Sequence, residues 1–268
     1  MSTKKKTLGV IGLGNMGGAI VKGLSSRKDL DLMGFDLDKE KLGSLKKYRL
    51  EPAKNPKELT AGCDYVILAV KPQHMRPVLK EISSAIGPEL CLISIAAGIT
   101  MDTLQKHSQG ACPVVRVMPN TPAMVGAGVF ALCLEDKKLK PAQKKFIPKL
   151  FSGIGQVHAL PEKLFDAFTA VAGSGPAYVF YFMEALIEAG VSLGLSRDQA
   201  TGMVKALFTG SSKLADQSGP RISELREMVT SPGGATIAAL NHMEESAMRG
   251  AIIGAVIKAC ERSRELGK

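Results

Sequence analysis

The sequence predicts a doubly wound α/β domain with a mainly parallel sheet, followed by a second domain that is entirely helical. Short β-branched runs alternate with helical segments from residue 7 to about residue 160, which is the pattern of a sheet covered by helices on both faces. A glycine-rich turn follows the first of these runs, as in Rossmann-type domains. After Pro161 only helical periodicity remains. We therefore expect the α/β domain over residues 1–160 and the helical domain over residues 161–268.

The expected strands are continuous apolar runs, such as Tyr65-Val66-Ile67-Leu68-Ala69-Val70. Runs of this kind suit parallel strands that are buried on both faces. Strands are predicted at residues 7–13, 31–35, 64–69, 90–95 and 113–118, and two more, at 129–134 and 156–159, close the sheet. Helices are predicted between them at residues 16–26, 39–47, 56–61, 75–86, 101–107 and 141–151.

Long stretches with few polar interruptions mark the helical half. Ser196-Arg197-Asp198-Gln199 has the form of a capping box and predicts a helix from there to about residue 214. Residues 245–265 form another helical stretch, whose small residues permit close helix packing. The most apolar stretch, residues 177–195, contains two glutamates and is predicted to be a buried helix, not a membrane span. Helices this apolar predict a homodimer built on the C-terminal half.

The composition is that of an ordinary globular protein, with 45% hydrophobic and 22% charged residues and a net charge of +10. The lysines and arginines are scattered, without interleaved aromatic residues, so nucleic acid is not an expected partner. A basic field instead favours an anionic cofactor and a carboxylate substrate. The five cysteines form no CxxC pair and no histidine stands at metal-ligand spacing, so no metal is expected and a reducing cytoplasm fits. Glycines interrupt the apolar run after the basic start, unlike a signal peptide.

The turn Gly12-Leu13-Gly14-Asn15-Met16-Gly17 has the spacing G-x-G-x-x-G between a predicted strand and a predicted helix. In this context the first glycine permits the tight turn, the second lets a pyrophosphate approach the backbone, and the third packs helix on strand. The helix N-terminus then receives the phosphate charge. The turn therefore predicts a nicotinamide dinucleotide, NADH or NADPH, bound over these six residues.

Asp36 lies at the end of the second predicted strand, about 20 residues beyond the glycines, where an acid bonds the adenosine ribose hydroxyls. It could also cap the helix that follows. An acid here repels a 2′-phosphate, so Asp36 favours NADH, although Lys39 and Lys41 lie nearby. Asn55 precedes another predicted helix and is expected either to touch the adenosine side or only to cap that helix.

Three further segments follow the carboxyl ends of predicted strands. Open α/β sheets bind ligands outside these ends, so the segments are expected to line one crevice together with the glycine turn. Ordinary strand-to-helix turns are the alternative interpretation. The segments are Ala69-Val70-Lys71-Pro72, Ser94-Ile95-Ala96-Ala97-Gly98 and Met118-Pro119-Asn120-Thr121-Pro122. In the last two, the expected cofactor contacts are Ala96-Ala97-Gly98 and Met118-Pro119-Asn120.

A loop in the helical half, Thr230-Ser231-Pro232-Gly233-Gly234-Ala235-Thr236, leads into a predicted helix. It offers backbone N–H groups and hydroxyls without net charge, which suits a small carboxylate. A helix–helix turn with a Ser or Thr cap fits the composition equally well.

These motifs, taken in order with Arg116-Val117-Met118-Pro119-Asn120 and Ala172-Gly173-Ser174-Gly175-Pro176-Ala177-Tyr178, resemble the pyrroline-5-carboxylate reductase family over essentially the whole chain. The resemblance implies reduction of the cyclic imine 1-pyrroline-5-carboxylate to L-proline by NAD(P)H, the last step of proline biosynthesis. It also implies a helical C-terminal domain that dimerises, with dimers joining into larger rings in some members.

The resemblance also implies roles for the loop in the helical half. It places Ser231, Gly234, Ala235 and Thr236 on the substrate carboxylate, with the Gly233 amide beside them, and directs the Thr236 hydroxyl toward the ring nitrogen. Thr236 is then the expected catalytic residue. Asp36 departs from the family, because many members carry a Ser/Asn/Arg-type segment there that accepts NADPH.

Two other functions are compatible with parts of the sequence. A β-hydroxyacid dehydrogenase has a similar layout but uses a lysine on the first long helix of its second domain, and residues 173–185 contain no Lys or Arg. Lys71 is a possible proton donor for such a reaction, although the segment Ala69-Val70-Lys71-Pro72 fits a cofactor lining better. A non-catalytic NAD(H)-binding regulator would not need a second anion-binding loop. The four histidines lie outside the two most characteristic loops, which suits an imine whose protonated form is already electrophilic.

Overall fold

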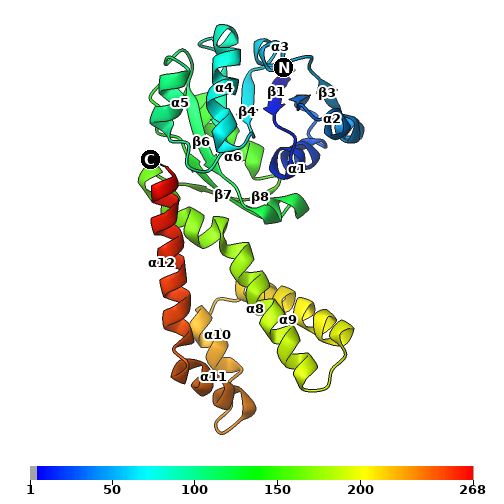
Figure 1. Cartoon of the computed structure of the whole chain (residues 1–268), viewed down its shortest axis with the longest axis vertical. Coiled ribbons are helices and arrows are strands. Elements are labelled where there is room, and N and C mark those ends of the chain that lie inside the picture. The colour runs from blue at the N-terminus through cyan, green and yellow to red at the C-terminus, as the bar shows by residue number, and fades with distance from the viewer. Residues whose placement is uncertain (1–4, 268) are drawn as a thin grey trace. The chain divides into compact units, whose positions relative to one another are not determined.

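The computed structural model describes residues 5–267, which form two compact units. One unit contains the described residues up to Ser174 together with those from Ala259 onward, and the other contains Gly175–Lys258. The domain boundary expected at residues 160 and 161 stays a prediction. Figure 1 shows the α/β unit with its sheet and the helices α8 to α12 of the remaining chain.

An eight-stranded sheet forms the centre of the α/β unit, in the order β3-β2-β1-β4-β5-β6-β7-β8. All neighbouring strands are parallel except β6 and β7. The strands are β1 (Lys6–Ile11), β2 (Leu30–Phe35), β3 (Leu50–Pro52), β4 (Tyr65–Leu68), β5 (Cys91–Ser94), β6 (Val114–Met118), β7 (Gly128–Cys133) and β8 (Gly155–Ala159). The predicted doubly wound, mainly parallel sheet is confirmed.

The strand order reverses between β1 and β4, and this reversal creates the site. Ile11 pairs with both Phe35 of β2 and Leu68 of β4, so these three strands end at the same level. The loops that leave them diverge to opposite faces, and open α/β sheets bind ligands in the crevice between such loops. Gly12, Asp36 and Ala69 are therefore brought together by register alone.

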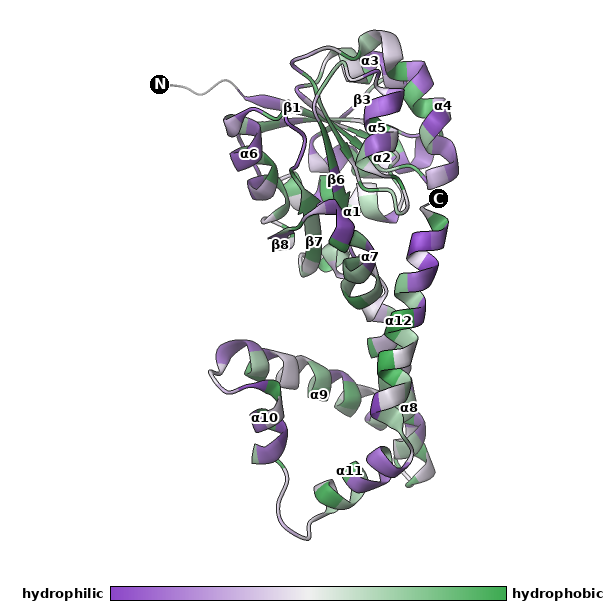
Figure 2. Ribbon diagram, turned by 90° about the vertical axis from the view of Figure 1, so that its left-hand side faces the viewer, coloured by the Kyte–Doolittle hydropathy of each residue, from purple (hydrophilic) through white to green (hydrophobic). Residues whose placement is uncertain are grey.

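Two hydrophobic cores cover the two faces of the sheet. Neighbouring residues of one strand enter opposite cores, as Val66 and Ile67 of β4 do, because side chains alternate along a strand. Both are fully buried, and the strands β6 and β7 are correspondingly green in Figure 2. The continuous apolar runs in the sequence are thus explained by burial on both sides.

The helices of this unit are capped as their sequences lead one to expect. Asp38, Asn55 and Thr100 accept backbone N–H bonds at the starts of α2, α3 and α5. The helices are α1 (Asn15–Leu24), α2 (Lys39–Leu45), α3 (Pro56–Ala61), α4 (Pro72–Ile82), α5 (Met101–His107), α6 (Pro141–Phe151) and α7 (Phe165–Phe168). Short helical turns η1 (Lys46–Tyr48), η2 (Ser83–Ala85), η3 (Thr121–Val125), η4 (Glu162–Leu164) and η5 (Thr169–Gly173) complete them.

Three details of the predicted elements were wrong. The edge strand β3 was not predicted, because three residues are too short to show a period. Helix α4 begins at Pro72, before the predicted residue 75, since proline is favoured in the first helical turn. The helical stretch predicted over residues 245–265 is interrupted at Ala247, which has a positive φ of 52° without being a glycine. No sequence signal marks that break.

The second unit consists of α8 (Gly175–Ser192), α9 (Arg197–Gln217), α10 (Ile222–Met228), α11 (Ala235–Glu245) and the first part of α12 (Met248–Leu266). The capping box predicted at Ser196 is confirmed, since its side chain accepts from the Gln199 N–H and the Gln199 side chain accepts from the Ser196 N–H. Helix α9 begins directly after the N-cap Ser196, at Arg197, and ends three residues later than predicted, at Gln217.

The prediction that the apolar stretch at residues 177–195 is buried was wrong for the single chain. No residue of α8 is buried, and Phe180 and Tyr181 are 64% and 77% exposed. The continuous helical run Glu162–Ser192 is long and apolar enough to cross a membrane by length and composition, and 6% of its most apolar window is buried. An apolar face this large calls for a partner surface.

Candidate cofactor and substrate sites

The turn between β1 and α1 has a backbone that only glycine adopts easily. Gly12 has a φ of +95°, and a Cβ added there would lie 2.7 Å from the Ala69 carbonyl oxygen. A Cβ added to Gly17 would lie 2.0 Å from the Gly12 carbonyl oxygen. The first and third glycines are therefore required by the fold itself.

Gly14 differs from the other two, because a Cβ added there meets no atom within 4 Å. It is the N-cap of α1, its φ of −64° suits any residue, and no side chain caps the helix at this point. The first turn of α1 also contains no acid. An uncapped helix N-terminus with open space in front of it fits an anion such as a pyrophosphate.

Asp36 fastens this turn to the end of β2. Its Oδ2 accepts the Leu13 N–H at 2.6 Å, and its Oδ1 accepts the Asp38 N–H at 2.9 Å. The Lys41 Nζ lies 3.8 Å from the same carboxylate. Asp36 does not cap α2, since Asp38 does so. The carboxylate of Asp36 is thus held at the edge of the glycine turn with lone pairs left for a ribose hydroxyl.

A cavity of about 490 Å³ opens over the crevice between β1, β2 and β4. Six of the predicted cofactor residues line it, namely Gly12, Gly14, Asp36, Ala69, Val70 and Lys71. Its remaining lining was not predicted and includes Ile11, Phe35, Leu37, Lys41, Pro56, His74, Pro77, Val78 and Glu81. Leu37 is strongly exposed although apolar. It directly follows Asp36, and this position beside the predicted ribose site is the sequence signal that could have identified it.

The other predicted cofactor residues do not line this cavity. They are Leu13, Asn15, Met16, Gly17, Asn55, Pro72, Ala96, Ala97, Gly98, Met118, Pro119 and Asn120. The Asn55 side chain accepts the Glu58 N–H at 2.8 Å and caps α3, which is the alternative that the sequence left open. Contact of any of these residues with a cofactor remains a prediction.

Asn120 is buried and its amide is used within the protein. Its oxygen accepts the Val129 N–H at 2.8 Å and its nitrogen donates to the Ala172 carbonyl at 3.0 Å. Asn120 therefore joins the turn after β6 to β7 and to η5, a single turn of π-helix. Such π-helical turns are rare and are frequent at functional sites.

Three of the five cysteines are not suited to nucleophilic or redox chemistry. Burial raises the pKa of the Cys63 thiol to about 12 and the pKa of the Cys112 and Cys133 thiols to about 11. Thiols with such pKa values stay protonated near neutral pH and are poor nucleophiles. No group of three or more His, Cys, Asp or Glu side chains that could hold a metal occurs within residues 5–267.

The loop before α11 presents the other predicted site. Gly233 has a φ of +67°, the Gly234 N–H donates to the Ser231 carbonyl at 3.1 Å, and Gly234 is the N-cap of α11 without a side-chain cap. Ser231, Ala235 and Thr236 are exposed. This eleven-residue helix therefore begins with uncapped N–H groups beside two hydroxyls, the arrangement expected of a carboxylate site.

Comparisons with known proteins cover the whole chain. A family model described as pyrroline-5-carboxylate reductase dimerisation matches residues 162–266, and one described as NADP oxidoreductase, coenzyme F420-dependent, matches residues 7–98. A pyrroline-5-carboxylate reductase from Corynebacterium melassecola is 37% identical over 98% of this chain and 99% of its own.

Solved structures give the same result. The pyrroline carboxylate reductase from Plasmodium falciparum, described with NADP bound, has a TM-score of 0.89 and is 33% identical over 100% of both chains. The pyrroline-5-carboxylate reductase from Coxiella burnetii has a TM-score of 0.91 and is 31% identical over 99% of this chain and 100% of its own.

Proposed function

Because the chain belongs to the pyrroline-5-carboxylate reductase family, we propose that it reduces 1-pyrroline-5-carboxylate to L-proline with NADH or NADPH. Similarity along the full length carries this proposal, since a relative of that name aligns with 98% of the chain at 37% identity. The glycine turn and the loop before α11 supply the two sites that such a reaction requires, one for a dinucleotide and one for a small carboxylate.

The residues of the glycine turn fit a nicotinamide dinucleotide. When bound, this cofactor supplies the hydride that reduces the C=N bond. The open space at Gly14 and the uncapped start of α1 receive the pyrophosphate. Asp36 accepts from a ribose hydroxyl and disfavours a 2′-phosphate, which supports NADH as the preferred cofactor, while Lys41 beside it reduces that bias.

On the substrate side, the start of α11 holds the carboxylate. Ser231 and the amides of Gly233 and Ala235 donate to it, while the Gly234 N–H, which donates to the Ser231 carbonyl, shapes the turn. The Thr236 hydroxyl orients the imine nitrogen. A protonated cyclic imine is already electrophilic, so these groups need to bind and orient the substrate and need not act as strong acids. The site therefore works without a histidine–carboxylate pair.

The second unit supports a homodimer in the same proposal. Its exposed apolar residues surround a cavity of about 700 Å³ that is almost entirely apolar. The Tyr178 hydroxyl, which lines this cavity, is buried without a hydrogen-bond partner among the described residues. A second copy of the chain would cover the apolar face and offer that hydroxyl a partner. Larger rings of dimers, a cytoplasmic location and the absence of membrane and nucleic-acid partners belong to this proposal.

The β-hydroxyacid dehydrogenase alternative is less well supported. Helix α8, the first long helix of the second unit, contains no lysine. The non-catalytic regulator is disfavoured because the uncapped, hydroxyl-flanked start of α11 would have no role in it.

Steady-state oxidation of NADH tests the proposal. We expect turnover with 1-pyrroline-5-carboxylate, with L-proline as the product in chiral chromatography. The same preparation should not oxidise short β-hydroxy acids with NAD⁺. Tight NADH binding without turnover of the imine would instead favour the regulator.

A further inference from the structure

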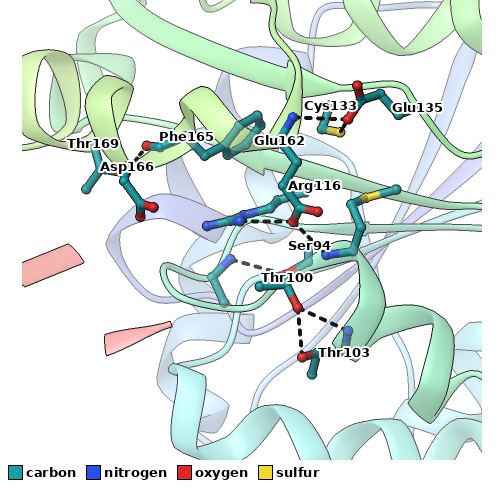
Figure 3. Close-up of polar contacts among 12 residues, drawn as sticks. Ser94, Thr100, Thr103, Arg116, Cys133, Glu135, Glu162, Phe165, Asp166 and Thr169 are labelled. Carbon is teal, nitrogen blue, oxygen red and sulfur yellow. Dashed lines mark hydrogen bonds and ion pairs between the residues drawn. The ribbon is translucent and has the colours of Figure 1, made fainter. Parts of the chain in front are cut away.

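A single carboxylate oxygen of Glu162 joins two elements of the α/β unit. This residue opens η4, directly after the loop that follows β8. Its Oε1 accepts from the Arg116 Nη1 at 3.0 Å and from the Met101 N–H at 2.7 Å. Figure 3 shows the bond between Arg116 and Glu162 above the start of α5. Strand β6 and helix α5 are thereby tied to the same atom.

The Arg116 guanidinium is buried, so its charge needs the Glu162 carboxylate as a partner. The Arg116 side chain is 8% exposed and that of Glu162 is 28% exposed. The Arg116 guanidinium also lies over the Phe165 ring, 4.8 Å from its centroid. Removing one partner of a buried ion pair leaves an uncompensated charge, so the guanidinium would move if Glu162 lost its charge.

Glu162 is itself held in place by its backbone. Its N–H donates to the Glu135 Oε2 at 3.0 Å, and Figure 3 shows this contact beside Cys133. The carboxylate therefore projects from an anchored position at the start of η4.

The two tied elements continue into two of the segments predicted to line the crevice with the glycine turn. Strands β5 and β6 lie on the other side of β1 from β2 and Asp36, and we assign that side to the nicotinamide. Arg116 lies two residues before Met118, where the segment Met118-Pro119-Asn120 begins. Met101 lies three residues after Gly98, where the segment Ala96-Ala97-Gly98 ends. One oxygen atom therefore links the two segments, in addition to the pairing of β5 with β6.

The second of these segments is also held at its other side. Gly98 has a φ of +73°, and a Cβ added there would lie 3.0 Å from the Leu266 carbonyl oxygen at the end of α12. The Ser263 hydroxyl of the same helix end bonds the Asp166 Oδ1 at 2.7 Å, one turn beyond Glu162. The loop after β5 is thus clamped between the end of α12 and the Glu162 carboxylate.

We propose that Glu162 is a positioning residue that sets the nicotinamide half of the cofactor crevice without touching the adenosine half. The adenosine half is held by other contacts, chiefly the Asp36 carboxylate on the Leu13 N–H. This inference rests on the proposed function, because it needs a bound nicotinamide dinucleotide. It adds the assignment of the loops after β5 and β6 to the nicotinamide.

The main test is the Glu162→Gln variant, which keeps an acceptor for the Met101 N–H and removes the charge that faces Arg116. We expect kcat for imine reduction to fall by about tenfold to a hundredfold, the effect of a misplacement of about 1 Å. The primary isotope effect with deuterated NADH should rise, since hydride transfer becomes slower than the other steps. The Kd of ADP-ribose, which lacks the nicotinamide, should stay within about twofold of the wild-type value.

Glu89→Gln serves as the matched control. Glu89 forms an ion pair with Lys140, but its side chain is 85% exposed. This variant should keep the wild-type kcat and isotope effect.

A second pair of variants tests the bond from the Met101 N–H to Glu162 and leaves the ion pair in place. Met101 is the first residue of α5, where proline is well tolerated but has no N–H to donate. Met101→Ala loses the side chain and keeps the N–H, whereas Met101→Pro loses both. We expect Met101→Pro to have the lower kcat and the weaker NADH binding of the two, with equal ADP-ribose binding. This comparison remains informative if Glu162→Gln fails to fold.

Wild-type kcat in Glu162→Gln would overturn the inference, as would a parallel loss of ADP-ribose and NADH binding. Equal behaviour of the two Met101 variants would do the same. If the wild-type protein does not reduce the imine at all, the proposed function fails. The difference between NADH and ADP-ribose binding then still tests the role of Glu162.

Discussion

At the scale of single residues, the three glycines of the turn after β1 have separate reasons to be glycine. Gly12 and Gly17 are required by the protein, since an added Cβ would meet backbone at 2.7 and 2.0 Å. Gly14 faces open space, so nothing in the fold itself requires a glycine there. Substitution of Gly12 or Gly17 is therefore expected to destabilise the fold, whereas substitution of Gly14 is expected to affect binding.

Gly14→Ala is expected to fold normally and to bind cofactor poorly. The backbone conformation of Gly14 suits alanine. Alanine also lowers the conformational entropy of the unfolded chain relative to glycine, so the substitution does not destabilise the fold. The new methyl group would occupy the space that we assign to the pyrophosphate. We predict an unchanged Tm and a Kd for NADH raised by about tenfold or more, measured by calorimetry. The matched control, Gly17→Ala, should lower the Tm, and a Gly14→Ala variant that binds NADH normally would contradict the assignment.

Asp36→Asn tests the cofactor preference. The amide still has an oxygen to accept one backbone N–H, but it no longer repels a 2′-phosphate and bonds ribose more weakly. Hydrogen bonds to charged groups are worth about 1.5–3 kcal/mol. We predict that kcat/KM with NADH falls about tenfold or more while kcat/KM with NADPH changes less. A larger loss with NADPH would show that Asp36 acts mainly through the glycine turn.

Thr236→Val tests orientation against acid catalysis at the start of α11. Valine keeps the shape of threonine and removes the hydroxyl. If the hydroxyl only orients the imine nitrogen, kcat should fall by about a hundredfold or less, and Thr236→Ser should restore most of it. A much larger loss, with a changed pH profile, would identify Thr236 as a proton donor.

At the scale of elements, thiols packed around the sheet make its stability depend on pH. Burial and, to a smaller extent, the charge of Asp64 raise the pKa of Cys63 to about 12, whereas an unfolded thiol has a pKa of about 8.5. Between these values the unfolded chain loses a proton that the folded chain keeps. The stabilising effect is complete below the unfolded pKa and is lost as the pH rises toward 12.

Urea denaturation at two pH values measures this effect. From pH 8 to pH 9.5 we expect the free energy of unfolding to fall by about 1 kcal/mol for each such thiol. Cys63→Ala should reduce this fall by that amount, whatever its effect at pH 8. Equal slopes for the variant and the wild type, at matched protein concentration and under reducing conditions, would refute the assigned cause.

At the scale of the whole molecule, the second unit has apolar helices and little to cover them. Phe180, Tyr181 and Ile252 are all more than half exposed. Apolar surface of this extent is unusual on a monomer and marks an interface. The burial that the sequence predicts for α8 therefore has to come from another copy of the chain.

Light scattering after size exclusion is expected to give a mass of two chains or a multiple of that at micromolar concentration. Ile252→Glu places a charge on the apolar cavity of the second unit and should shift the protein toward monomer or precipitate. Val125→Glu changes an apolar residue that is even more exposed than Ile252 but lies in the α/β unit, and it should leave the mass unchanged. A wild-type monomer would refute the dimer.

How far the sequence predicts this protein can be judged from particular elements. The strands other than β3, the capping box at Ser196 and the helix at residues 141–151 were predicted from period and caps, because these signals are local. The break at Ala247 was missed, since a non-glycine residue with positive φ has no local signal. Leu37, Pro77 and Val78 all line the cavity. Leu37 is distant in sequence from the other two, so their proximity depends on how α4 packs.

The sequence alone determined the fold class, the glycine turn and the family, because each of these depends on residues close together in the chain or on motifs in order. The tertiary structure decided which atoms join the loops of the α/β unit to one another. Asp36 on the Leu13 N–H and Glu162 on the Met101 N–H are contacts across 23 and 61 residues. Such bonds follow from strand register and helix packing, and no pattern within a short window of sequence encodes them.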